Sequence, residues 1–194
     1  MDDTKPKLSK PDFTVKIAKF KPDLLKRKRD AWGVEITAGD EIIQIYFGGT
    51  VPSMIYLCTL LKAKIGLPLS REVFKHRLPN RNSHTPRHKD VVWLNKVYNV
   101  FYRGANTEFD QWYKKFDHIN SDNNRNSRAD VIGQGKCAAI RVIKENLKKL
   151  PEIYDYCVLH SDQTKKETLY SINIPAEIIE LPQELEELIG PVKL

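Results

Sequence analysis

The hydrophobic pattern of this chain changes its period at Gly48-Gly49, and this change restricts the fold more than any other sequence feature. Before the two glycines, apolar residues alternate with polar ones over 13–20, 32–37 and 41–47, and many of them are β-branched. Alternation with a period of two is typical of half-buried strands, whereas spacings of three and four are typical of amphipathic helices. We therefore expect an α+β protein in which a small antiparallel β-sheet precedes a helical region.

Glycine and proline residues mark the ends of the first predicted elements. The turn at Ala38-Gly39-Asp40 contains a residue that tolerates positive φ, so the strands on either side of it should form a hairpin. Residues 51–65 should form a helix that ends at Gly66. A second helix should begin at Ser70 and continue toward Leu78, so that two helices meet across a tight turn.

The rest of the chain predicts three more helices and a hairpin. The helices are expected over 90–103, 107–119 and 135–150, and the strands of the hairpin over 154–160 and 167–174. The second of these helices carries an aromatic stripe at spacings of three and four, which we interpret as core: Phe109, Trp112, Tyr113 and Phe116. Residues 176–194 are acidic and should form a short helix or arm.

Charge is distributed unevenly along the chain. The net charge is +7, but residues 61–150 carry 19 basic and 8 acidic groups, a local charge of +11, and residues 151–194 carry 3 and 9, a local charge of −6. A surplus of this kind attracts a polyanion, and nucleic acid is the first partner to consider. The alternative is that the lysines only keep a basic protein soluble.

Several classes of protein do not fit the sequence. It has no apolar run near the ~20 residues that span a bilayer, and its first ten residues lack the apolar core of a secretory signal. Its three cysteines, Cys58, Cys137 and Cys157, are widely spaced and odd in number, so they predict neither a disulfide framework nor a zinc knuckle. We expect a cytoplasmic protein without a membrane partner.

Three stretches of the chain resemble the winged helix-turn-helix family of DNA-binding proteins, in particular the effector domains of bacterial response regulators. Gly49-Thr50-Val51-Pro52 with the following helix resembles the first helix of that family, and Gly66-Leu67-Pro68-Leu69-Ser70-Arg71-Glu72 resembles its turn and the opening of its second helix. Leu169-Tyr170-Ser171-Ile172-Asn173-Ile174-Pro175 resembles the last strand of the wing. The resemblance implies a transcriptional regulator that reads duplex DNA through a helix and a β-hairpin wing.

On this reading the chain has three parts. Residues 1–48 form the N-terminal β-sheet portion, 49–175 the winged-helix domain and 176–194 the acidic C-terminal arm. The chain departs from the family pattern by about fifty additional residues between the second helix and the hairpin. We interpret the segment around 88–119 as a helical insertion or a contact between two copies in a homodimer.

Two helices compete for the role of recognition helix. The segment 90–103 fits the family spacing better, but its face is mostly apolar. The segment 134–149 comes directly before the predicted hairpin and presents Gln134, Lys136, Arg141 and Lys148. We therefore prefer the second segment.

The candidate DNA-binding residues follow from what a helix in the major groove needs. Gln and Arg have the bidentate geometry that reads adenine and guanine, so Gln134 and Arg141 are the candidates for base contacts. Phosphate contacts add affinity without sequence information. The candidates for them are Lys136, Lys144, Lys148, Arg125 and Arg128, together with Lys165 and Lys166 in the connector 161–166 of the wing. A solvated helix face is the alternative reading of all these residues.

Enzymatic and metal sites are not expected. The chain lacks the common phosphate-loop, dinucleotide, nucleophile-elbow and metalloprotease motifs. His76, His84 and His88 lie in or beside the basic segment 79–89, which offers little of the fixed geometry that zinc requires. A metal-dependent nuclease would need carboxylates such as those of Asp90, Glu108 and Asp110, but carboxylates on helix surfaces usually only face solvent. We expect no catalytic residues, no cofactor and no metal.

Two other functions remain as alternatives. The aromatic region 91–116 would bind a partner chain in a protein-interaction module, with the acidic tail regulating it. Single-stranded nucleic acid or RNA would stack its bases on Trp93, Tyr98, Trp112 and Tyr113 if these side chains were exposed.

Overall fold

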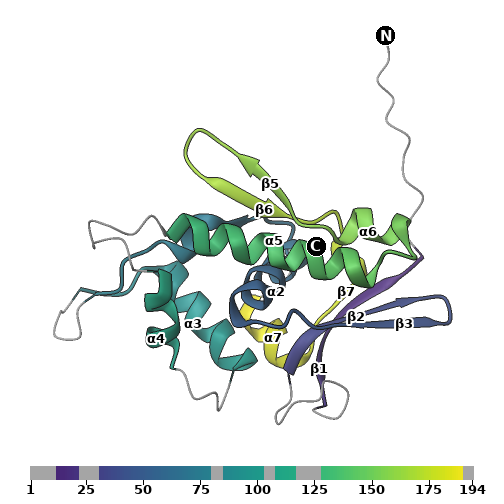
Figure 1. The fold of residues 1–194 in the computed structure, drawn as a ribbon. Helices are drawn as coiled ribbons and strands as arrows, with labels where there is room; N and C mark the ends of the chain where they lie inside the picture. Colours follow the sequence, from purple (N-terminus) through teal and green to yellow (C-terminus); the bar gives the residue numbers. More distant parts are fainter. Residues whose placement is uncertain (1–11, 22–30, 80–84, 103–107, 117–127, 190–194) are drawn as a thin grey trace.

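The structure is a computed structural model that describes residues 12–21, 31–79, 85–102, 108–116 and 128–189 of the 194-residue chain. These residues form an α+β fold with six α-helices, a four-stranded mixed sheet and a three-stranded antiparallel sheet (Figure 1). In chain order the elements are β1 (Thr14–Phe20), β2 (Ala31–Ala38), β3 (Glu41–Ile45), α2 (Thr50–Lys64), β4 (Leu69–Ser70), the 3₁₀ turn η1 (Arg71–Phe74), α3 (Lys89–Phe101), α4 (Phe109–Tyr113), η2 (Lys114–Phe116), α5 (Arg128–Asn146), α6 (Pro151–Cys157), β5 (His160–Gln163), β6 (Thr168–Ser171), η3 (Ala176–Ile178), β7 (Ile179–Glu180) and α7 (Gln183–Ile189).

The first sheet confirms the three predicted N-terminal strands and adds one from the far end of the chain. Its order is β3-β2-β1-β7, and the pairs β1–β2 and β2–β3 are antiparallel. Gly39 has φ +56° in the tight turn between β2 and β3, as the predicted hairpin requires. Strand β7 pairs in parallel with β1, with Val15 opposite Ile179, so the sheet is mixed rather than purely antiparallel.

Helix α2 lies at the centre of the molecule. All residues from 53 to 61 are buried, which is typical of a core helix. The helix contacts β2, β4, β6, α5 and α7. It starts after Gly49, whose backbone is extended, and the chain turns away at Gly66, which has φ +70°. The predicted helix over 51–65 is confirmed within one residue at each end.

The predicted second helix is mostly absent, and the second sheet begins where that helix should start. Its order is β4-β6-β5, with Leu69 opposite Tyr170. The helix expected from Ser70 toward Leu78 is only the 3₁₀ turn η1, although Ser70 is its N-cap and accepts a hydrogen bond from the Glu72 amide. The expectation of a full second helix here was wrong, because the chain enters the sheet at Leu69 and leaves the helical path after Phe74.

Two elements downstream also differ from the prediction: one in its boundaries and one in its type. Helix α5 begins at Arg128 rather than near 135 and ends at Asn146. The predicted strand over 154–160 is wrong, because residues 151–157 form α6, with Pro151 in its first turn and Ile153 and Cys157 buried one helical turn apart. Strand β5 begins only at His160, so α6 separates α5 from the hairpin.

The aromatic stripe is core, as predicted. Phe109, Trp112, Tyr113 and Phe116 are all buried, and they pack against one another and against Tyr98 of α3. Buried residues of the three segments 1–48, 49–175 and 176–194 belong to one hydrophobic cluster. Among the described helices, none combines the length and the apolar content that crossing a bilayer requires.

Candidate nucleic-acid interface

One face of α5 fixes the helix against α2. Its buried residues recur at spacings of three and four, as a helix packed on one side requires: Ile132, Gly135, Ala139 and Ile143, followed by Leu147 just after the helix. At Gly135 a Cβ atom would lie 2.5 Å from Val51 Cγ1 and 2.9 Å from Ile55 Cδ1 of α2. The two helices are therefore so close at Gly135 that any residue with a Cβ atom would force the side chains of α2, or one of the helices, to move.

The opposite face of α5 carries three of the nine predicted DNA-contacting residues into solvent. Gln134, Arg141 and Lys144 are exposed, and so is Lys148, which lies in the turn just after the helix. Between residues 131 and 149 there are five basic residues and one acidic residue, Glu145. No ion pair involves these basic residues within the part of the chain that the structure describes.

The β5–β6 hairpin lies beside α5, and a side-chain contact joins the two (Figure 1). Lys136 is half-buried, and its Nζ donates a hydrogen bond of 3.0 Å to Ser161 Oγ in β5. Lys136 was predicted to contact phosphate, but in the structure its ammonium group contacts the hairpin. This exposed contact links the hairpin to α5.

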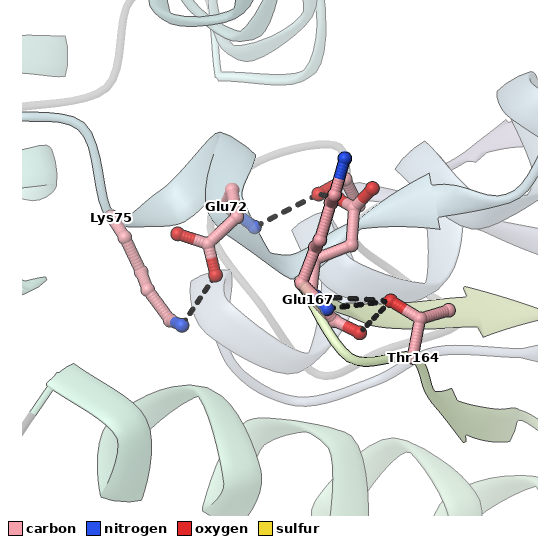
Figure 2. Close-up of polar contacts among 6 residues, drawn as sticks. Glu72, Lys75, Thr164 and Glu167 are labelled. Carbon is pink, nitrogen blue, oxygen red and sulfur yellow. Dashed lines mark hydrogen bonds and ion pairs between the residues drawn. The ribbon is translucent and has the colours of Figure 1, made fainter.

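The turn of the hairpin is held by one threonine, as Figure 2 shows. Thr164 Oγ1 accepts hydrogen bonds from the Lys166 and Glu167 amides at 3.3 and 3.0 Å, and donates to the Glu167 carbonyl at 2.8 Å. The Thr164 amide donates to the same carbonyl at 2.9 Å. Lys165 and Lys166 are exposed on this ordered turn.

The hairpin is also anchored to the segment that follows α2. Ser70 Oγ donates a short hydrogen bond to the Glu167 carboxylate and accepts one of 3.2 Å from the Glu72 amide. Glu72 in turn pairs with Lys75 Nζ at 2.5 Å (Figure 2). Contacts from β4 and η1 thus hold the residue that follows the two exposed lysines.

The structure gathers the candidate residues into two groups. Gln134, Arg141, Lys144 and Lys148 lie on the outer side of α5 and the turn after it, and Lys165 and Lys166 lie on the turn of the hairpin. Arg128 is the first residue of α5, and Arg125 lies outside the described residues. Whether these residues contact DNA stays a prediction.

Helix α3, the rival recognition helix, and the aromatic residues of the two alternative functions mostly face the core. The apolar face of α3 is buried, from Val91 to Phe101, and so are Tyr98, Trp112 and Tyr113. Trp93 is half-buried, with Lys62 Nζ 4.4 Å from the centre of its ring. These buried rings do not present the open faces that stacked bases require.

Sequence reasoning considered His76, His88 and Asp90 separately and did not bring them together. Each of the three offers a metal-ligand atom, and these atoms lie within 4.8 Å of one another. The two histidines were set aside because the basic segment 79–89 was expected to lack fixed geometry, and Asp90 because it was expected to face solvent. Of the other residues considered for metal sites, Asp110 pairs with Arg87 at 2.7 Å, and His84 lies outside the described residues.

In comparisons with known proteins, no protein-family model, no curated protein and no solved structure matches this chain. The functional argument therefore rests on the residues and their geometry.

Proposed function

We propose that this protein binds duplex DNA through the outer face of α5 and the turn of the β5–β6 hairpin, as a winged helix-turn-helix regulator would. The observation that carries the proposal is the exposed row formed by Gln134, Arg141 and Lys144 beside a hairpin whose ordered turn exposes Lys165 and Lys166. Both groups of cations belong to elements that are fixed by packing or by hydrogen bonds.

The order of the elements supports the proposal. The first helix, the recognition helix and the wing of a winged helix-turn-helix protein correspond in order to α2, α5 and β5–β6, whereas the second helix of that family is here only the 3₁₀ turn η1. Helices α3 and α4 occupy the segment around 88–119 that we interpreted as an insertion. The short helix α6 lies between the proposed recognition helix and the wing.

The proposed contacts are of two kinds: contacts with base edges, which read the DNA sequence, and contacts with phosphates, which position the protein on the duplex. An α-helix with its side chains is about 10–12 Å across and fits the major groove, which is about 12 Å wide. Arg141 would pair with guanine and Gln134 with adenine, while Lys144, Lys148, Lys165 and Lys166 would meet phosphates. Release of counterions from those phosphates makes the affinity fall steeply with salt.

The test is a titration of the full chain with a mixed-sequence duplex at several salt concentrations. The double variant Lys144→Ala/Lys148→Ala should bind more weakly and lower the slope of log affinity against log salt by about 2, because each phosphate contact contributes about 0.9. Both side chains are exposed, so the thermal midpoint should change little.

The control removes the same number of lysines elsewhere. Lys16→Ala/Lys96→Ala takes two exposed lysines from β1 and α3 and should leave the slope unchanged. The absence of any salt-sensitive binding to duplex would exclude the proposal, and an equal loss in both double variants would exclude the assigned face. Tighter binding to a single strand of the same sequence would favour the stacking alternative instead.

A further inference from the structure

We propose that His76, His88 and Asp90 form a binding site for a divalent transition metal of the zinc type. The three residues come from two segments: His76 lies two residues after η1 ends at Phe74, and His88 and Asp90 lie at the start of α3. The site is separate from the proposed DNA-binding face and does not depend on it.

The ligand atoms already have two of the spacings that a zinc ion requires. His76 Nε2 lies 3.3 Å from Asp90 Oδ2, and His88 Nδ1 lies 3.5 Å from the same oxygen. In a tetrahedral site with bonds of about 2.0–2.1 Å, neighbouring ligand atoms are about 3.3–3.4 Å apart. Two edges of the tetrahedron are therefore present before any ion enters.

The position of His88 suits a metal ligand. Its Nδ1 caps α3 by accepting a hydrogen bond from the Asp90 amide, and the same nitrogen faces the Asp90 carboxylate. At 3.3 Å the capping bond is longer than usual, so a metal would replace a weak contact.

One metal ion would be bound by both imidazole rings. The two rings are stacked, with centroids 3.6 Å apart and an angle of 22° between their planes. They must tilt apart for both lone pairs to point at one ion. The side chains of His76, Asp90 and His88 are 26%, 35% and 44% exposed, which leaves room for that rotation.

The surrounding charges leave Asp90 available. Arg87, next to His88 in the chain, donates a hydrogen bond of 2.7 Å to Asp110 and so pairs with a different carboxylate. Three protein ligands leave a fourth position for water on the exposed side of the ion. The ion would join the segment after η1 to the first turn of α3.

The test uses the full chain without a histidine tag, freed of metal by a chelator and titrated with Zn²⁺ in a calorimeter. We expect one ion bound per chain through this cluster. Co²⁺ should give the intense visible absorption of a tetrahedral site, and Zn²⁺ should displace it. His76→Ala and Asp90→Asn should each weaken Zn²⁺ binding more than about 10-fold, since losing even an outer-shell partner costs that much.

The matched control is His160→Ala, which removes an exposed histidine from β5 and should leave the affinity unchanged. Far-ultraviolet circular dichroism of the metal-free variants checks that they fold. If His76→Ala does not fold, Asp90→Asn, which keeps the shape of the side chain, gives the same comparison. Failure of the wild-type chain to bind Zn²⁺ or Co²⁺ would overturn the proposal. Equal affinity in the wild type and the folded variants would also overturn it, because the ion would then bind elsewhere.

Discussion

The three cysteines differ in their surroundings. Burial raises the pKa of the Cys157 thiol to about 12, and burial raises the pKa of the Cys58 thiol further still. Cys137 is exposed on α5. A thiol whose pKa is raised stays protonated at pH 8, and the protonated thiol is not the nucleophile.

We expect a thiol reagent at pH 8 to modify Cys137 quickly in the folded protein and Cys58 and Cys157 only after denaturation. Counting the thiols that react before and after adding denaturant measures this difference, and Cys137→Ser should remove the fast phase. Three equally fast thiols would show that the core around α2 and α6 is not packed as described.

At the scale of residues, exposure was largely predictable and long-range contacts were not. The helical period places Gln134 and Arg141 on the outer face of α5, because inner and outer positions follow from spacing, whereas Lys136, which we expected to be presented with them, is half-buried. The contact of Lys136 with Ser161 joins residues 25 apart, and His76 meets Asp90 across 14 residues. No local pattern records which distant side chain will face a given residue.

At the scale of elements, the packing of α5 on α2 depends on Gly135. The variant Gly135→Ala places a methyl group against Val51 and Ile55, and Val51 is β-branched and stiff. Overpacking usually costs about 1–3 kcal/mol, which exceeds the gain of about 0.5–1 kcal/mol from the helix propensity of alanine, so we expect the free energy of unfolding to fall. Chemical denaturation measures it.

The neighbouring glycine provides the control within the same helix. A Cβ atom at Gly133 meets nothing within 4 Å, so Gly133→Ala should raise the free energy of unfolding by about 0.5–1 kcal/mol through helix propensity. Equal effects of the two substitutions would contradict the close contact between α5 and α2.

The elements that sequence reasoning placed correctly have strong, uninterrupted patterns. Apolar and polar residues alternate over much of β1 and β2, and α2 is bounded by glycines at both ends. Residues 154–157 also alternate between aromatic and other side chains, yet they are helical, because Pro151 starts a helix. Cys157 is buried against α2, and its carbonyl accepts a hydrogen bond of 2.8 Å from the Tyr56 hydroxyl of that helix. Tertiary packing decided this short segment.

At the scale of the whole molecule, the acidic C-terminal segment is integrated into the fold. Ile179 is 1% exposed and pairs with β1, and Lys64 Nζ donates hydrogen bonds to the Ala176 and Ile179 carbonyls at 3.1 and 2.7 Å. We expect Ile179→Ala to lower the free energy of unfolding by about 2–5 kcal/mol, as core truncations do. Thermal and chemical unfolding of the full chain measure the loss.

The matched control is an isoleucine in the same sheet. Ile42 in β3 is 64% exposed, so Ile42→Ala should change the free energy of unfolding by less than about 0.5 kcal/mol. If the two substitutions had equal effects, the C-terminal segment would be the loosely attached arm that its composition suggests.

The pairing of β7 with β1 also sets an order of events during synthesis. Until residues 179 and 180 have left the ribosome, the nascent chain holds β1 with an open edge on the side opposite β2. Open edges recruit strands from other chains, and pairings between distant residues form slowly. This edge of β1 therefore stays open until β7 has been synthesised, and a product arrested before β7 would be the form most prone to aggregate.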